Sequence, residues 1–318
     1  MNREGYLGVD IGGTNVKMAL VSPAGKILAR GQIEAAVERG PEDVFKRIAR
    51  AVPALLSGDR RLVAAGIDCA GLIDIKRGVL LTSPNFPGWR DVPIRRIAGR
   101  VLGVQTFVDN DANAAAYGEY RAGAGRGYAN VVCITLGTGV GGGIIADGKV
   151  LRGGHNFAGE IGHVAINMDG PLCSCGNRGC LEAYIGKRAL VRSARAKLSS
   201  RGGRILGRLS SRQLRSLTPR MIQEAALKGD RTALEVFYEA AEYLGSGIAV
   251  LVNLLNPDVV AIGGGVSGAF QLMETRLKQA VRARVFDEAA AVVKICRAQL
   301  GNDSSTIGAA LYAKDMAA

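Results

Sequence analysis

The chain has 318 residues, of which 48% are hydrophobic, and its formal net charge is +13. A chain of this length and apolar content can bury two ordinary domain cores, which excludes a disordered or fibrous protein. No apolar run approaches the roughly 20 residues that span a bilayer, and no signal peptide precedes the first predicted strand. We therefore expect a cytoplasmic protein that does not insert into a membrane.

The first predicted element is a β-hairpin over residues 7–21. Apolar residues lie on both sides of the turn Asp10-Ile-Gly-Gly-Thr14, whereas a dinucleotide-binding fingerprint needs a helix directly after its glycines. The turn offers backbone N–H groups and a hydroxyl to an anion, and Gly12 and Gly13 permit close approach. Asp10 lies in a place suited to the shell of a Mg²⁺ ion. Taken alone, the motif is also compatible with an ordinary structural turn that binds no ligand.

The next predicted elements are a helix over 41–56, a strand over 62–68, a turn over 71–74 and a loop over 82–89. Asn85 in this loop is a candidate ligand-binding residue, with turn capping as an equal alternative. A strand over 104–108 then ends at Asp109-Asn110-Asp111-Ala-Asn113, ahead of a helix over 114–122. Such a cluster at the carboxyl end of a strand is typical of α/β ligand sites. Capping the helix would need only one of Asp109, Asp111 or Asn113.

The second half of the chain repeats the hairpin pattern. Residues 131–145 are predicted as a strand, a Gly/Thr turn around Thr138 and Gly139, and a second strand. Two such turns about 125 residues apart predict a duplicated core with a cleft between its halves. The remaining predicted elements are helices over 218–227 and 231–255, a strand from 258 to a glycine turn at 263–265, a strand over 292–297 and a helix over 306–314.

Four potential metal ligands lie in the segment 154–182, namely His163, Cys173, Cys175 and Cys180. One imidazole and three thiolates form the soft, closed tetrahedral site that structural zinc prefers. A disulfide or simple apolar packing is the alternative, although the glycines between the cysteines favour a tight metal loop. Glu160 and Glu182 bracket the segment and are not needed by the metal. The loop is therefore expected to position something else as well.

Eleven Lys and Arg residues lie between Lys187 and Arg220, in a segment that contains no acid. A patch of this kind is typical of polyanion or nucleic-acid binding. No aromatic side chain occurs in the segment to stack on bases. We therefore expect a solvated helix face with a mobile loop around residues 199–203, and no nucleic-acid partner.

The three glycine turns, the Asn110-Asp111 pair and the metal segment together resemble the ROK family of sugar kinases and repressors over nearly the whole chain. Residues 10–14 and 136–143 are similar to its two phosphate motifs, and residues 263–267 resemble its adenosine motif. Residues 160–163 and 173–182 match its sugar and zinc motifs. The chain departs from the family in Ala70, where proline is usual, in Gly186, where serine is common, and in its arginine-rich segment.

The resemblance implies an α/β protein with the actin-like ATPase fold, in which two ribonuclease-H-like domains flank a cleft. Residues 1–112 with 305–318 would form the small domain, and residues 113–304 the large domain with the zinc loop. The family also implies a homodimer or homotetramer. Only six residues precede the first predicted strand, too few for the winged helix of the family's repressors, which favours a free-standing kinase.

The resemblance also assigns the site residues. Asp111 would be the catalytic base, with the neighbouring Asp109 as the alternative. The sugar would be bound by Asn85, Asn110, Asp111, Glu160, His163 and Glu182, and His163 would use one ring nitrogen for structural Zn²⁺ and the other for the sugar. Mg²⁺ and ATP would be bound by Asp10, Gly12, Gly13, Thr14, Lys17, Thr138, Gly139 and Gly265.

The expected function is ATP-dependent phosphorylation of a hexose at its 6-hydroxyl, from glucose to glucose 6-phosphate. Alternatives within the enzyme class are a kinase for fructose, mannose, N-acetylglucosamine or N-acetylmannosamine, or a glucokinase that uses polyphosphate through the basic segment. A sugar-sensing module without turnover is the alternative outside it. That reading is disfavoured because a sensor has no use for Asp111.

Overall fold

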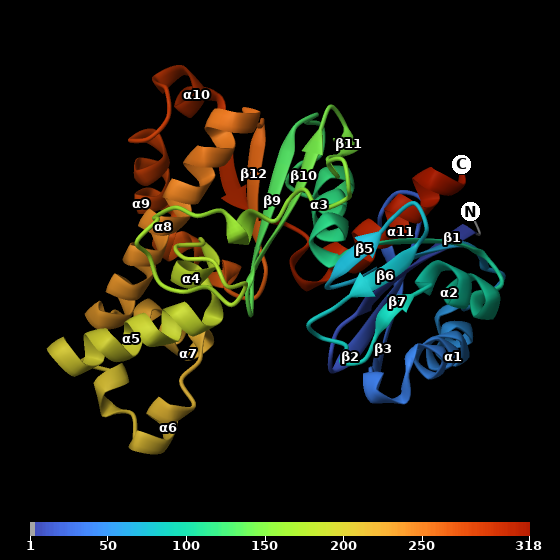
Figure 1. Cartoon of the computed structure of the whole chain (residues 1–318), viewed down its shortest axis with the longest axis horizontal. Coiled ribbons are helices and arrows are strands. Elements are labelled where there is room, and N and C mark those ends of the chain that lie inside the picture. Colours follow the sequence, from blue (N-terminus) through green and yellow to red (C-terminus); the bar gives the residue numbers. More distant parts are fainter. Residues whose placement is uncertain (1–3) are drawn as a thin grey trace. The chain divides into compact units, whose positions relative to one another are not determined.

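The computed structural model describes residues 4–318 and contains two five-stranded sheets (Figure 1). The first contains, from edge to edge, β3 (Ile27–Glu34), β2 (Asn15–Val21), β1 (Glu4–Ile11), β4 (Arg61–Cys69) and β8 (Gln105–Asn110). The second contains β11 (Lys149–Val150), β10 (Val140–Ala146), β9 (Val131–Leu136), β12 (Val259–Gly263) and β13 (Lys294–Arg297). In both sheets the first strand in sequence is central and the next two extend to one side. This repeated order agrees with the predicted duplication.

A small sheet and the helices complete the fold. The small sheet contains β5 (Leu72–Asp74), β6 (Val79–Thr82) and β7 (Arg90–Val92). The helices are α1 (Pro41–Ala51), α2 (Ile94–Leu102), α3 (Asp111–Ala122), α4 (Glu182–Ile185), α5 (Lys187–Arg201), α6 (Ser211–Arg215), α7 (Pro219–Leu227), α8 (Arg231–Leu255), α9 (Phe270–Arg282), α10 (Asp287–Val292) and α11 (Ser304–Ala317). Within residues 4–318, no helix has the length and apolar character needed to cross a membrane.

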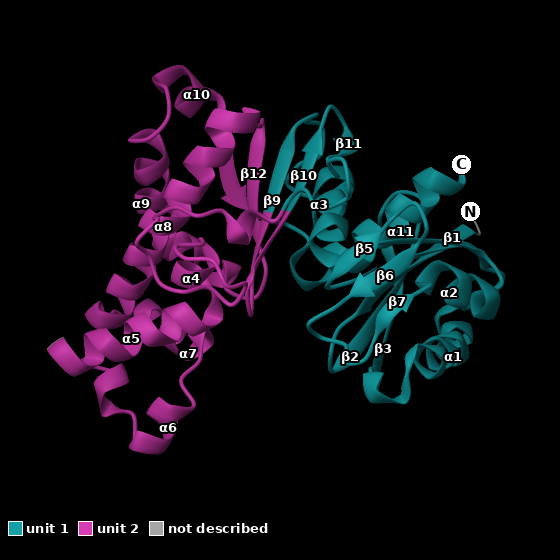
Figure 2. Ribbon diagram, viewed as in Figure 1, with its two compact units in different colours: residues 1–133, 143–159, 299–318 teal, residues 134–142, 160–298 magenta. Residues whose placement is uncertain are grey.

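The chain divides into two compact units, which Figure 2 colours separately. Unit 1 comprises residues 1–133, 143–159 and 299–318, and unit 2 comprises residues 134–142 and 160–298. The unit boundaries therefore fall inside β9 and β10, and α3 belongs to unit 1. The division into ribonuclease-H-like domains expected from the sequence, 1–112 with 305–318 against 113–304, stays a prediction.

The two faces of the first sheet carry different residues because side chains alternate along each strand. The odd-numbered residues of β1 from 7 to 11 join an apolar core with residues of α1 and α2. On the other face, Gly8 and Gly66 lie against α11, where an added Cβ atom would come within 1.8 and 2.0 Å of backbone oxygens of that helix. Asp10 and Asp68 follow these glycines by two residues and lie on the same face of the sheet. The two carboxylates therefore lie on the face that α11 covers.

The 25-residue helix α8 is the longest element of unit 2 and packs against α5, α7 and α9. Its N-cap, Asp230, is fully buried and accepts hydrogen bonds from the backbone N–H groups of Ala233, Ile205 and Leu206. Burial acts to raise the pKa of Asp230, but these N–H donors outweigh it and hold the pKa below its usual value. Asp230 thus connects residues 205 and 206 of the arginine-rich segment to the N-terminus of α8.

The predicted hairpins and the helix over 231–255 are confirmed, but some boundaries differ. The predicted turn over 71–74 is largely strand β5, and the helix predicted over 41–56 ends at Ala51 and continues as a 3-10 helix over Val52–Leu55. Strand β8 extends to Asn110, so α3 begins at Asp111 instead of residue 114. Helices α2 and α9 were not predicted.

Candidate active site and metal cluster

The first glycine turn joins β1 to β2 as a tight hairpin. The N–H group of Gly12 donates to the carbonyl oxygen of Asn15 at 3.0 Å, and Lys17 Nζ lies 3.5 Å from Asp10 Oδ2 across the hairpin. Gly13 is exposed, and an added Cβ atom would lie 3.4 Å from the carbonyl oxygen of Asn85. The structure thus brings the predicted ligand residue Asn85 next to the predicted phosphate turn, both within unit 1.

Three carboxylates lie side by side where the parallel strands β1, β4 and β8 end. Asp10 pairs in register with Asp68, and Asp68 pairs with Asp109. Asp68 is completely buried, and no hydrogen-bond donor among the described residues reaches either of its oxygens. Burial, followed by the charges of Asp10, Asp111 and Asp109, raises the pKa of Asp68 well above its usual value. Burial without a donor therefore favours the neutral, protonated form of Asp68 over the ionised one.

Asp109 differs from Asp68 because it has several hydrogen-bond donors. Arg152 contacts it through two nitrogens, at 2.8 Å to Oδ1 and 2.5 Å to Oδ2. The Nδ2 group of Asn113 and the backbone N–H of Asn110 also donate to Oδ1, at 3.2 and 2.8 Å. With 4% of its surface exposed, Asp109 is poorly suited to accept a proton from a substrate. This geometry favours Asp111 over Asp109 as the candidate base.

Asn110 caps the helix that carries Asp111. Its Oδ1 accepts from the N–H groups of Ala112 at 2.8 Å and Asn113 at 3.4 Å, and its Nδ2 donates to the carbonyl oxygen of Gly71 at 3.3 Å. The capping alternative weighed for Asp109, Asp111 or Asn113 thus named the wrong residues. Asp111 is the first residue of α3 and is half-buried, and its Oδ1 accepts from the N–H group of Ala112 at 2.9 Å. A role for Asn110 in sugar binding stays a prediction.

The second glycine turn joins β9 to β10 in unit 2. The N–H of Gly137 donates to the carbonyl oxygen of Gly139 at 2.9 Å, and Thr138 is exposed at the tip. The third glycine turn packs against the start of this one. Gly264 has φ of +83°, and an added Cβ atom there would lie 2.4 Å from the carbonyl oxygen of Leu136. Gly265 has open space around it, as its predicted role at the nucleotide requires.

Glu182 connects the second turn to the metal loop. Its Oε2 accepts from the N–H group of Val140 at 2.9 Å, and its Oε1 accepts from the hydroxyl of Ser174 at 2.8 Å. An added Cβ atom on Gly139 would lie 2.2 Å from the same carboxylate, so a larger residue there would displace Glu182 from this contact. Sequence reasoning assigned Glu182 to the sugar and did not identify its contact with the phosphate turn, nor the role of Ser174.

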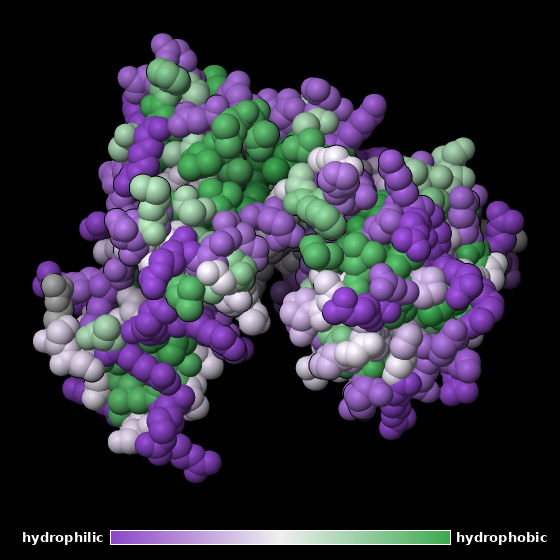
Figure 3. Space-filling model, viewed as in Figure 1, coloured by the Kyte–Doolittle hydropathy of each residue, from purple (hydrophilic) through white to green (hydrophobic). Residues whose placement is uncertain are grey.

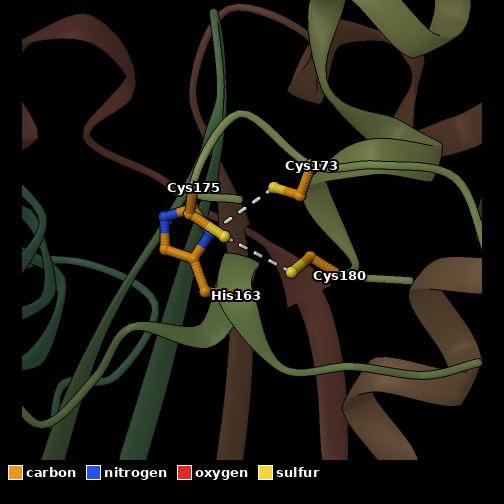
Figure 4. Close-up of side chains that lie close together, drawn as sticks. All are labelled: His163, Cys173, Cys175 and Cys180. Carbon is orange, nitrogen blue, oxygen red and sulfur yellow. Dashed lines mark hydrogen bonds between the residues drawn. The ribbon is translucent and has the colours of Figure 1, made fainter. Parts of the chain in front are cut away.

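The four predicted metal ligands come together in unit 2, as Figure 4 shows for His163, Cys173, Cys175 and Cys180. Their ligand atoms all lie within 4.8 Å of one another. The distances from His163 Nδ1 to Cys173 Sγ and from Cys175 Sγ to Cys180 Sγ are both 3.7 Å. Sulfur atoms bound tetrahedrally at about 2.3 Å from zinc lie about 3.8 Å apart, so the donor set fits a Zn²⁺ ion. Glu160 precedes this cluster and is exposed, and its carbonyl oxygen accepts from the N–H of His163 at 3.0 Å.

The basic segment lies on α5, α6 and α7, where hydrophilic side chains run over the face seen in Figure 3. Several of its cations have partners within unit 2. Arg192, Arg195 and Arg204 donate to backbone carbonyl oxygens, and Lys197 and Arg220 pair with glutamates. These contacts favour a structural role for much of the segment over a polyanion site.

Comparison with known proteins finds relatives that match nearly the whole chain. The sequence model of the ROK family matches residues 6–316. A glucokinase of Streptomyces coelicolor is 37% identical and one of Thermotoga maritima is 35% identical, each over 97% of both chains. A solved structure of a ROK family glucokinase from Streptomyces griseus, in complex with glucose and AMPPNP, is 36% identical and has a TM-score of 0.81 over 98% of this chain and 99% of that chain. With the two similar sheets, this likeness confirms the actin-like ATPase fold with two domains.

Sequence reasoning missed Asp68 and Arg152. A signal for Asp68 was present, because it ends a buried strand as Asp10 and Asp109 do, and parallel strands bring such ends together. Arg152 carried no comparable signal, since its partner Asp109 lies 43 positions earlier in the chain.

The raised pKa of Asp68 makes folding stability depend on pH. The folded chain keeps a proton that the unfolded chain releases, so this contribution is fully present below the unfolded pKa and is lost as pH rises toward the folded pKa. Between the two pKa values, the loss is about 1.4 kcal/mol per pH unit. Asp68→Asn is neutral at every pH and should not show this loss.

The check is thermal unfolding of both proteins at several values between pH 5 and pH 8. We expect the melting temperature of Asp68→Asn to rise relative to that of the unsubstituted chain as pH increases. Parallel pH dependence in the two proteins would show that Asp68 titrates normally.

Proposed function

The chain belongs to the ROK family, and we propose that it is a hexokinase that transfers a phosphoryl group from ATP to the 6-hydroxyl of glucose. The observation that carries this proposal is the likeness, over 98% of the chain, to a family member in complex with glucose and AMPPNP. Both glucokinases reported above are also matched along almost their full length. We further propose a cytoplasmic homodimer or homotetramer, as the resemblance to the family implies.

Phosphoryl transfer requires positioning, neutralisation of charge and a group that accepts the proton of the attacking hydroxyl. We assign proton acceptance to Asp111, whose carboxylate lies at the N-terminus of α3, where the helix dipole favours the ionised form. In a loose transition state the sugar hydroxyl loses its proton late, so an ordinary carboxylate suffices as base. Asp109 is unsuited to this role because Arg152 already holds both of its oxygens.

The nucleotide is assigned to the three glycine turns. The exposed tips at Gly13, Thr14 and Thr138 offer N–H groups and hydroxyls to phosphates, and Gly265 leaves room for the base or ribose. Mg²⁺, when bound with ATP, would neutralise charge on the phosphates, and Asp10 is its candidate neighbour in the protein. Lys17 opposes Asp10 across the hairpin and keeps the acidic edge from repelling the nucleotide.

The sugar is assigned to residues with directional hydrogen bonds. Glu160 and Asn85 are exposed and offer carboxylate and amide groups to hydroxyls. His163 places Nδ1 in the metal cluster, which leaves Nε2 for a substrate hydroxyl. Within the protein, Glu182 accepts one hydrogen bond at Oε2, from Val140, and two at Oε1, from Ser174 and more distantly from the Cys173 thiol. The remaining lone pair of Oε2 is available to a sugar hydroxyl.

We assign a structural Zn²⁺ to His163, Cys173, Cys175 and Cys180. Four protein ligands leave no open position for a reactive water, so the ion would hold the loop and take no part in the chemistry. Burial and the neighbouring thiols raise the pKa of Cys180 to about 12. A bound cation would stabilise the thiolate forms of three cysteines packed this closely.

The substrate prediction is tested by coupled assays with glucose, fructose, mannose, N-acetylglucosamine and N-acetylmannosamine, each with ATP and with polyphosphate. We expect the highest kcat/KM for glucose with ATP. A higher kcat/KM for another sugar would identify that sugar as the substrate, and a higher kcat/KM with polyphosphate would identify polyphosphate as the donor. Absence of turnover with every pair, together with measurable sugar binding, would instead identify a sensor.

The metal prediction is tested by elemental analysis of the purified chain and of Cys175→Ala. We expect about one zinc per chain, lost in the variant together with thermal stability, because structural zinc contributes folding free energy directly. Cys296→Ala is the matched control, since Cys296 lies on β13 outside the cluster, and it should retain the metal. Full zinc content in Cys175→Ala would exclude this ligand set.

A further inference from the structure

Arg152 is a partly buried cation that the proposed chemistry has not used. It follows β11, and its side chain is 17% exposed while that of its partner Asp109 is 6% exposed. Its guanidinium also lies over the ring of Tyr312 from α11, 5.3 Å from the ring centre. A buried arginine of this kind is costly to desolvate unless its partner fits it closely. Here the partner, Asp109, accepts a hydrogen bond from Arg152 at each of its two carboxylate oxygens.

The contacts of Asp109 connect this ion pair to the junction between β8 and α3. Besides Arg152, its donors are the backbone N–H of Asn110 and the side-chain amide of Asn113. Both residues flank Asp111, and Asn110 is the cap of α3. Fixing the Asp109 carboxylate therefore fixes the strand end and the first helical turn on which the candidate base is mounted.

Charge gives the ion pair a second effect. Asp68 lies between Asp10 and Asp109 in the register of the sheet, and the charges of Asp10, Asp111 and Asp109 all act on its carboxyl group. Lys17 faces Asp10 from β2, and Arg152 faces Asp109 from the segment after β11. Without Arg152, Asp109 would be a buried, uncompensated charge two residues from Asp111.

We propose that Arg152 is a positioning residue for phosphoryl transfer, which acts through Asp109 to hold Asp111 in place and to keep a neighbouring negative charge neutralised. Its catalytic part rests on the proposed function and on Asp111 as the base. Arg152 accepts no proton and needs no contact with the substrate. Its effect is on the geometry and ionisation of another residue.

The test uses three variants of the full chain. Arg152→Met removes the charge and both donors while keeping a long side chain. Arg152→Met combined with Asp109→Asn leaves an uncharged pair. Arg30→Met is the matched control, because Arg30 pairs with Asp303 in the same unit but is 64% exposed.

The primary measurement is the carboxyl titration of Asp111 by NMR on protein labelled at aspartate carboxyl carbons, with the signal assigned through Asp111→Asn. In Arg152→Met we expect the pKa of Asp111 to rise by about one unit, because a like charge nearby disfavours ionisation. The double variant should return it to the value of the unsubstituted chain. Arg30→Met should leave it unchanged.

The second measurement separates catalysis from binding. We expect kcat of Arg152→Met for glucose to fall about 10- to 100-fold, as a small misplacement of a catalytic group does. The Kd for glucose should change less than about threefold, since no sugar ligand is removed. The midpoint of the acidic limb of kcat/KM should rise with the pKa of Asp111.

An unchanged pKa of Asp111 together with an unchanged kcat in Arg152→Met would reduce Arg152 to a packing residue. If that variant does not fold, Arg152→Gln takes its place, because an amide retains a hydrogen bond to Asp109 without the charge, and the same shifts are expected. Absence of sugar phosphorylation by the unsubstituted chain would contradict the hexokinase proposal. The NMR titration would still decide whether Arg152 controls Asp111.

Discussion

The electrostatics of unit 1 depend on one constraint, the register of three parallel strands. Because β1, β4 and β8 end side by side, Asp10, Asp68 and Asp109 are brought into a row on one face of the sheet. Three adjacent carboxylates cannot all remain ionised at low cost. The three carboxylates differ in how this constraint is met: Lys17 lies beside Asp10, burial raises the pKa of Asp68, and Arg152 pairs with Asp109.

These different solutions determine what each carboxylate can do. Asp68 is completely buried and cannot reach a substrate, and Asp109 is held by Arg152. Asp111 lies beyond the row, at the start of α3 and only half-buried. Its suitability as the base thus follows from its position as much as from its chemical type.

In unit 2, the carboxylate of Glu182 contacts two separate segments of the chain. One carboxylate supports the phosphate turn at Val140 and accepts a hydrogen bond from Ser174 in the metal loop. Glu182 therefore connects the Cys-rich loop directly to the second glycine turn. These contacts give Glu182 a structural role beside the candidate metal ligands.

The parts of the site that the sequence predicted depend on local patterns. Apolar residues on both sides of Gly12 and Gly139 were enough to predict hairpins, and the spacing of three cysteines was enough to predict that they converge. Asp68 was missed although its place at the end of a buried strand was a signal, whereas the partners of Arg152, Asp109 and Tyr312, lie far away in sequence and come near only in the folded chain. The cap of α3 was misassigned because four neighbouring polar residues satisfy the same local rule.

The measurement that tests the account most directly is turnover and sugar binding by Asp111→Ala. The account predicts that phosphorylation of glucose falls by about 10²- to 10⁴-fold, the usual contribution of a general base. Calorimetry should show glucose binding close to that of the unsubstituted chain. A variant that still phosphorylates glucose at nearly the original rate would contradict the assignment of Asp111 and the role proposed for the acidic edge around it.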